Sequence, residues 1–312
     1  MDNPVGEQVK SGLLPTPGLA SGAMTAKAVR PSRRLGWISL RISWYVVLTV
    51  FSVVLALPFF WLVSTSLKAR GTEFLVPPQW IPQPIEWDNY RIALFESGLP
   101  FTTFLVNTVL ITTFNLIGSL VVGSLVGFGF ARLRFPGRQT LFLCVLSTMM
   151  LPGVVTLIPS YLLFKTFGWV NTWLPLIVPT YFGGGAFNVF LFRQYFLTIP
   201  RDLDEAARMD GASTWQIYGR IALPLAGPVL ATVAIFSFLD NWNNFLGALI
   251  YLNSLDKMTL AVGLQAFQGV RQSDWNLMMA AATIMVIPVM ALFLFTQRYF
   301  MRGIVMTGMG GR

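Results

Sequence analysis

Long apolar stretches, separated by short polar segments, dominate the sequence from about residue 42 onward. A helix that crosses a bilayer needs about 20 mostly apolar residues, whereas the strands of a membrane barrel would alternate apolar and polar positions over about 10. The stretches have the helical length, and prolines such as Pro152 and Pro159 are expected to kink or break one of them. The pattern therefore predicts an all-α membrane protein with six spans, at about residues 42–66, 102–130, 139–164, 172–192, 224–250 and 276–297.

Composition supports a membrane protein and excludes several kinds of chemistry. Of the 312 residues, 54% are hydrophobic and 11% are charged, against about 25% charged residues in a soluble domain. With no histidine and the single cysteine Cys144, the chain has no histidine-ligated metal, histidine-based triad or internal disulfide. It also lacks the G-x-x-x-x-G-K-[ST] phosphate loop and any nucleophile–base constellation. We therefore expect no enzyme activity and no cofactor bound by this chain.

The distribution of lysine and arginine predicts the orientation. With the N-terminus inside, sixteen basic residues lie in inside segments and six in outside loops. This asymmetry favours an arrangement with both termini in the cytoplasm, and it accounts for the net charge of +9 without nucleic acid. Residues 1–41, rich in Pro, Gly and Ser, are predicted to form a disordered basic cytoplasmic tail, residues 42–300 the transmembrane domain, and residues 298–312 a cytoplasmic C-terminal tail.

A polar segment, PRDLDEAARMDGASTWQIYGRIALP at 200–224, separates the fourth and fifth spans. Asp202 and Glu205 have the spacing of a capping box for a first short helix, and Gly211 would end that helix with a positive φ. Ser213 and Gln216 would open a second short helix in the same way, and Pro224 would occupy the first turn of the fifth span. The sequence therefore predicts a cytoplasmic helical hairpin.

The hairpin has two other interpretations. It could be a plain connection, but a connection needs only a few residues, and this one uses about 25 with two sets of caps. It could be a DNA-binding helix-turn-helix, but both of its ends are fixed to a bilayer.

The segment resembles the EAA loop in the membrane subunits of bacterial ATP-binding-cassette importers. EAA-x-x-DGAS at 205–213, followed by Ile221-x-Leu223-Pro224, matches in register. Three further stretches, LKARGTEFLVPPQWIP, FARLRFPGR and QRYFMRGIVMTGMGG, resemble the sugar-importer branch, and the last of them resembles the second membrane subunit of the maltose importer family. The resemblance implies the type I importer permease fold and a coupling helix that docks to an ATPase, with Glu205, Ala206, Ala207, Arg208, Asp210, Gly211, Ala212 and Ser213 at the contact.

The resemblance also implies the partners and the process. These are a second permease, two ATPase subunits that bind ATP and Mg, and an extracytoplasmic solute-binding protein, in a bacterial inner membrane. The expected function is ATP-driven uptake of a carbohydrate by alternating access. Two alternatives stay open: the same importer class carrying glycerol phosphate esters, and an ion- or proton-coupled transporter. The latter would need several intramembrane ionisable groups, of which the sequence offers one.

That one group is Asp240, in FLDNWNNF at 238–245. An ionisable residue inside a span is a functional candidate, and sugars are bound by polar edges and aromatic faces. The predicted pathway residues are therefore Asp240, Asn241, Trp242 and Asn244, with Asn115 as a weaker candidate. The alternatives are that the 238–245 stretch unwinds near the outer half of the membrane and packs on the partner permease, that it acts as a gate, and that Asn115 forms an interhelical hydrogen bond. Met149 and Met150 are expected to pack in the core.

The charge distribution makes the topology testable. Single cysteines replacing Thr72, Asp256 or Thr214, in a Cys144→Ser background, would be treated in intact cells with a membrane-impermeant thiol reagent. Labelling is expected at positions 72 and 256 and not at position 214, because only the first two lie in predicted outside loops. The reverse pattern would overturn the orientation.

Overall fold

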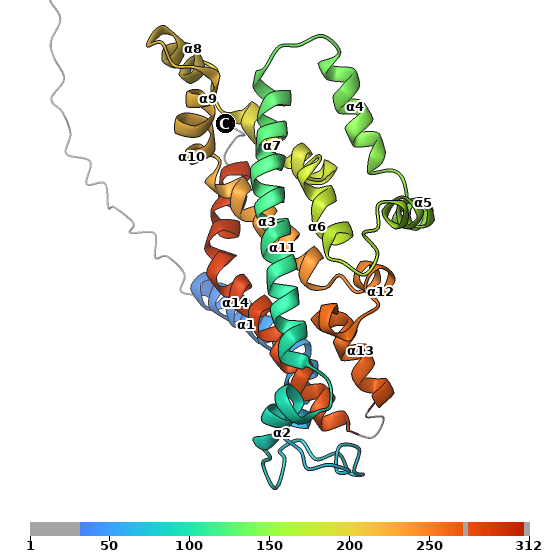
Figure 1. The fold of residues 1–312 in the computed structure, drawn as a ribbon. Coiled ribbons are helices and arrows are strands. Elements are labelled where there is room, and N and C mark those ends of the chain that lie inside the picture. Colours follow the sequence, from blue (N-terminus) through green and yellow to red (C-terminus); the bar gives the residue numbers. More distant parts are fainter. Residues whose placement is uncertain (1–31, 271–273, 309–312) are drawn as a thin grey trace, which may run out of the picture. The chain divides into compact units, whose positions relative to one another are not determined.

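The computed structural model describes residues 32–270 and 274–308, and every regular element in this part of the chain is helical. Figure 1 shows their arrangement. Short π-helical or 3-10 turns at Ile92–Glu96, Tyr218–Ala222 and Leu255–Lys257 join some of the helices. The α-helices are α1 Ser32–Ser66, α2 Asp88–Arg91, α3 Phe101–Arg132, α4 Arg138–Thr148, α5 Gly153–Thr166, α6 Leu174–Tyr181, α7 Ala186–Thr198, α8 Asp202–Met209, α9 Thr214–Ile217, α10 Leu223–Leu225, α11 Gly227–Trp242, α12 Leu246–Tyr251, α13 Leu260–Val270 and α14 Trp275–Gly308.

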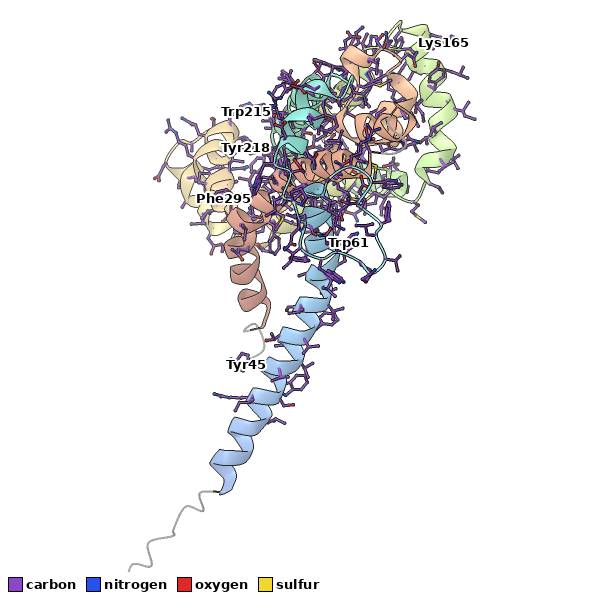
Figure 2. The ribbon with its side chains drawn as sticks, turned by 90° about the horizontal axis from the view of Figure 1, so that it is seen from below. Tyr45, Trp61, Lys165, Trp215, Tyr218 and Phe295 are labelled. Atoms are coloured by element: carbon purple, nitrogen blue, oxygen red, sulfur yellow. The ribbon has the colours of Figure 1, made fainter. Side chains whose placement is uncertain are left out.

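The chain divides into two units, residues 1–56 and 57–312. The described part of the first unit is the N-terminal portion of α1, whose side chains from Leu40 to Ala56 are exposed, as expected of a helix surrounded by lipid. Figure 2 labels Tyr45 on this portion. Because α1 begins at Ser32, residues 32–41 are helical rather than part of a disordered tail, and residues 1–31 of the predicted tail lie outside the described residues.

Four helices in the described residues are long and apolar enough to cross a membrane, and two bent pairs raise the number to six. One bent pair is α4 with α5, which meet at 97° around Pro152, so the predicted break in the third span is confirmed. The sixth span continues as one helix to Gly308, through most of the segment predicted as a C-terminal tail.

The fifth span is less regular than the single helix predicted over 224–250. The chain bends by 77° at Ala226, before the Gly227–Pro228 pair, because Pro228 has no N–H for the helical ladder. The helix then stops at Trp242 and α12 begins at Leu246. Asn244 stabilises this break, since its Oδ1 accepts the backbone N–H of Gly247 at 3.0 Å. The break after Trp242 agrees with the alternative that the 238–245 stretch unwinds, and the bend at Ala226 is a second interruption.

Close packing joins α3 to α7, and to the turn before α7, through glycine. A Cβ on Gly127 would lie 2.5 Å from the Cβ of Phe192, and a Cβ on Gly184 would collide with the backbone of Gly123. Small residues allow two backbones to approach closely in a membrane, where apolar burial does not distinguish a helix neighbour from lipid. Phe128 of α3 packs edge-on against Phe196 of α7, with ring centroids 5.7 Å apart.

Near the N-terminal end of α3, polar side chains join the segment after α1 to α2 and α14. The amide of Asn89 donates to the carbonyls of Ser66 and Lys68, each at 2.9 Å, and Asn276 donates to the carbonyl of Lys68 at 3.3 Å. Lys68 itself is buried, donates to the carbonyl of Glu73 at 3.2 Å, and lies 3.9 Å above the Trp61 ring. These contacts fix the loop that follows the first span.

The glycine contact predicts that adding one methyl group to α3 has different effects on stability at two nearby positions. Gly127→Ala should destabilise the protein by about 1–3 kcal/mol, because Phe192 and the α7 backbone must move. Gly129→Ala is the matched control, because a Cβ there meets nothing within 4 Å, and it should be neutral or stabilising. The melting temperatures of the purified variants test this. Equal melting temperatures would show that α3 and α7 are less closely packed.

Candidate functional site

The loop between α7 and α11 begins with α8, an eight-residue helix with three acids in its first turn. Asp202, Asp204 and Glu205 lie where the partial positive charge of the helix N-terminus favours carboxylates. The predicted side-chain cap from Asp202 is wrong. Asp202 is already the first helical residue, the preceding position is Arg201, and no side chain caps the helix there.

The end of α8 has the hydrogen bonds of a Schellman motif. The N–H of Gly211 donates to the carbonyl of Arg208 at 3.0 Å, and the N–H of Ala212 donates to the carbonyl of Ala207 at 2.9 Å. Gly211 has φ +81°, so the predicted left-handed glycine is confirmed. A Cβ at this position would meet no other atom within 4 Å, so a substitution would cost backbone strain and not a clash.

The second predicted cap is confirmed in full. The N–H of Ser213 donates to Oε1 of Gln216 at 2.7 Å, and the N–H of Gln216 donates to Oγ of Ser213 at 3.3 Å. This capping box opens α9, which continues through the π-helical turn Tyr218–Ala222 into α10. Pro224 lies in the first turn of α10 rather than at the start of the fifth span.

Two side chains of α3 attach this loop to the membrane-spanning helices. Arg132 is nearly buried and donates to the carbonyl of Ile199 at 2.7 Å, while its other terminal nitrogen lies 3.3 Å from the carboxylate of Asp204. Near the other end of the loop, the hydroxyls of Tyr218 and Ser124 are 2.7 Å apart. The loop is therefore held at both ends by the same helix.

The residues of the EAA motif divide between two faces. Ala207 and Ala212 are half-buried and pack on the apolar cluster of α3 and α7, so their small size serves the fold of this chain. Glu205, Ala206, Arg208, Asp210, Gly211 and Ser213 are exposed. Two large apolar side chains accompany them, Met209 at 89% and Trp215 at 73% exposure, and both were missed from the sequence. The sequence pattern that indicates them is the occurrence of two large apolar residues inside an otherwise polar segment.

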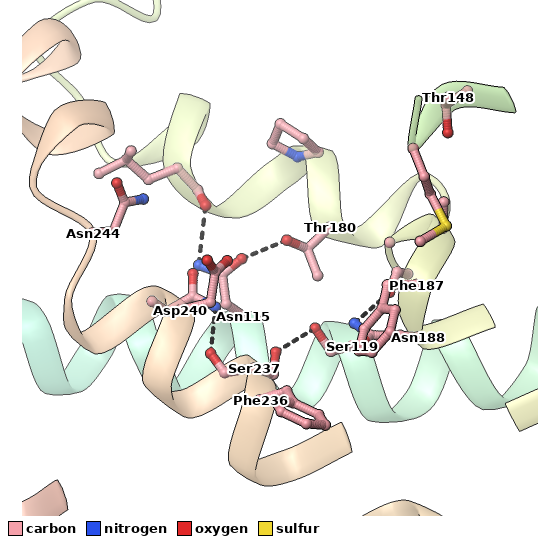
Figure 3. A pocket seen from close by; sticks show the side chains of 17 residues that line it. Asn115, Ser119, Thr148, Thr180, Phe187, Asn188, Phe236, Ser237, Asp240 and Asn244 are labelled. Carbon is pink, nitrogen blue, oxygen red and sulfur yellow. Dashed lines mark hydrogen bonds between the residues drawn. The ribbon is translucent and has the colours of Figure 1, made fainter. Parts of the chain in front are cut away.

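The second candidate site is a polar cavity of about 690 Å³ among α3, α6, α7 and α11. Figure 3 shows that Asp240, Asn244, Ser237 and Asn115 come together there from α3, from α11 and from the break that follows α11. Asn241 also lines the cavity, and its amide donates to the carbonyl of Ser237 at 2.7 Å. Four of the five predicted pathway residues therefore border one space.

Two of the predicted pathway residues, Asn115 and Trp242, make contacts that hold helices together. The side chain of Asn115 donates to the carbonyls of Ile111 and Leu176, each at 3.0 Å, and accepts from the Thr180 hydroxyl at 2.5 Å, which joins α3 to α6. Trp242 is outside the cavity, contrary to the prediction. It is buried, stacks on Phe238, and donates to the carbonyl of Met285 at 3.1 Å, because its indole faces α14.

Several cavity residues were missed. Ser237 belongs to a polar face that the spacing 237, 240, 241 and 244 would have revealed, and Ser119 follows Asn115 by four positions. Thr180 and Phe187 come from the broken fourth span and have no comparable signal. Met149 and Met150 were expected in the core and are exposed, because the chain turns sharply between α4 and α5, and Met149 lines the cavity.

The attachment through Arg132 predicts a local effect. Arg132→Met should increase amide hydrogen exchange across residues 202–213, since it leaves two acceptors without their donor, each worth about 1–3 kcal/mol when buried. Arg134→Met, at an exposed position two residues along, is the control and should leave that exchange unchanged. Equal protection in both variants would show that the loop does not depend on Arg132.

Known proteins with this sequence pattern and fold are membrane components of importers. Residues 119–305 match the family described as "Binding-protein-dependent transport system inner membrane component". The arabinooligosaccharide transport permease AraQ of Halalkalibacterium halodurans is 36% identical over 80% of this chain and 86% of its own. The maltose/maltodextrin transport permease MalG of Escherichia coli K12 is 31% identical over 86% of this chain and 95% of its own.

A solved structure gives the same result for the fold. A bacterial ABC transporter "involved in the import of the acidic polysaccharide alginate" includes a chain that is 26% identical and superposes with a TM-score of 0.72, over 87% of this chain and 98% of that one. The sequence match, the helical fold and the EAA loop agree: this chain belongs to the binding-protein-dependent transport system inner membrane components, the multi-pass permeases of ABC importers.

Proposed function

We propose that this permease imports a carbohydrate by ATP-driven alternating access and that the loop 202–217 docks to a separate ATPase subunit. The observation that carries the proposal is the construction of the loop. Its inner face is joined to α3 by Arg132 and Tyr218, and its outer face presents Glu205, Arg208 and Trp215 to solvent. The loop can therefore contact a partner on one side and move α3 from the other.

The outer face has the chemistry of a binding surface. Met209 and Trp215 offer large apolar contact area, and aromatic side chains and methionine are enriched in protein interfaces. Exposed charged groups, among them Arg208 and Asp210, are their neighbours in the sequence. Arg201, Glu205 and Arg208 also border a polar cleft of about 400 Å³ together with Arg132 and Arg134 at and just beyond the end of α3. Charge pairs at such a rim orient a partner and set its register.

The remaining parts of the importer follow from the family. A second permease would complete the pathway, two ATPase subunits would bind ATP and Mg, and an extracytoplasmic solute-binding protein would deliver the substrate. Both termini would lie in the cytoplasm of a bacterial cell. The sugars in the names of the relatives support a carbohydrate as substrate. Glycerol phosphate esters are the second candidate substrates.

Two substitutions in the loop test the docking function. Glu205→Ala removes an exposed carboxylate and costs α8 only about 0.3–1 kcal/mol, because no cap depends on it. Gly211→Val costs on the order of 1–2 kcal/mol and redirects α9. Both variants should insert normally and lose most uptake, and Gly211→Val should also retain less ATPase on purification. The measurements are membrane level, co-purification of the ATPase, ATP hydrolysis and substrate uptake.

Thr214→Ala is the matched control. Thr214 is exposed and next to the Ser213 cap, but it makes none of the capping bonds, so its loss should be mild. Near-normal uptake by well-inserted Glu205→Ala and Gly211→Val proteins would show that the loop is only a connection. Uptake driven by a proton or sodium gradient without ATP would instead support a secondary transporter.

A further inference from the structure

The cavity among α3, α6, α7 and α11 contains one formal charge among the described residues that line it, the carboxylate of Asp240. The other polar groups are neutral amides and hydroxyls, from Asn115, Asn188, Ser119 and Thr180 among others. Within the described residues no lysine or arginine lines the cavity, and the Asp240 carboxylate has neither an ion-pair nor a hydrogen-bond partner. Asp240 is therefore the one full charge in the described lining, and the N-terminal turn of α7 adds only a partial positive charge.

The Asp240 carboxylate must be in contact with water or solute. A carboxylate facing hydrocarbon costs about 2.5–3.5 kcal/mol on insertion scales. Asp240 is exposed and lies thirteen residues after Gly227, where α11 begins, which is about 20 Å along the axis of a helix that belongs to a candidate membrane span. A charge at that depth is tolerated where the protein supplies an aqueous path, and the cavity is such a path.

We propose that this cavity is an anion-excluding section of the translocation pathway, in which Asp240 makes the permease select neutral or amine-bearing sugars over phosphate esters and acidic sugars. The inference rests on the proposed function and narrows its substrate class. Phosphates and carboxylates are held in proteins mostly by arginine and lysine, neither of which is in the described lining. The N-terminal turn of α7 does line the cavity, but its partial positive charge of about half a unit is smaller than the full negative charge of Asp240. The permease of similar fold belongs to an importer of an acidic polysaccharide, so the fold itself does not decide the charge of the solute.

The rest of the lining suits a neutral sugar. Asn188, Asn241 and Asn244 present amides on two sides of the cavity, and sugar hydroxyls both donate and accept hydrogen bonds. Phe187 and Phe236, with ring centroids 5.6 Å apart, supply apolar surface for the C–H face of a sugar ring. The volume of about 690 Å³ is within the range of sites for small molecules.

The test measures the potential in the cavity directly with charged thiol reagents. Thr180→Cys places a thiol on the cavity wall opposite α11, in a Cys144→Ser background and in the assembled importer in lipid nanodiscs. Its rates with a cationic and an anionic methanethiosulfonate of similar size are divided by the rates of the same reagents with 2-mercaptoethanol. Phe167→Cys is the reference, because Phe167 is exposed at the end of α5 and outside the cavity.

The cation-to-anion ratio at position 180 should exceed that at position 167 by at least about threefold, as expected for one unit charge at several ångströms in a wet cavity. Adding Asp240→Asn should lower the ratio at position 180 to the reference value, and Asp240→Glu should preserve it. Equal ratios at the two positions, an Asp240→Asn variant with an unchanged ratio, or a position 180 that reacts with neither reagent would each overturn the proposal. Because the modification requires neither ATP nor transport, its failure is distinguishable from a failure of the loop variants to lose uptake.

Discussion

The close contact between α3 and α7 is the constraint on which the rest of this permease depends. Gly127 allows Phe192, and Gly184 allows the backbone of Gly123, to approach at distances that a side chain on either glycine would prevent. In a membrane, apolar side chains gain little by leaving lipid for a neighbouring helix, so the steric fit between helices decides which of them associate. Once α3 is fixed against α7, its polar side chains are directed toward the cavity at one level and toward the loop between α7 and α11 at another.

The helix α3 connects the two candidate sites. Asn115 and Ser119 border the cavity, while Ser124 and Arg132 hold the loop between α7 and α11. Asn115 and Arg132 are seventeen residues apart, about 26 Å along a continuous helix. A helix without a proline or a break over that distance transmits a displacement more directly than the interrupted helices α4–α5, α6–α7 and α11–α12.

The interrupted helices supply what α3 lacks, which is irregular backbone beside the cavity. Backbone groups without helical partners are tolerated at membrane depth where they line a cavity or are buried in protein. The breaks at Phe182–Gly185 and at Asn243–Phe245 have this setting, since Gly184, Gly185 and Asn244 all line the cavity. The breaks thus give the cavity its shape and expose the side chains of Thr180 and Phe187 to it.

The sequence by itself determined the helical class, the position of most spans, the Gly211 turn and the Ser213–Gln216 cap, because these depend on local hydrophobicity and on hydrogen bonds between near neighbours. It also singled out Asp240, since a charge in an apolar stretch is conspicuous without any structure. Only the tertiary structure decided that Trp242 faces α14, that Asn115 is hydrogen-bonded to α6, and that Arg132 rather than a local cap holds α8. Each of these depends on a partner far away in the chain, brought near by the packing of helices, and no local pattern records which side of a helix will meet that partner.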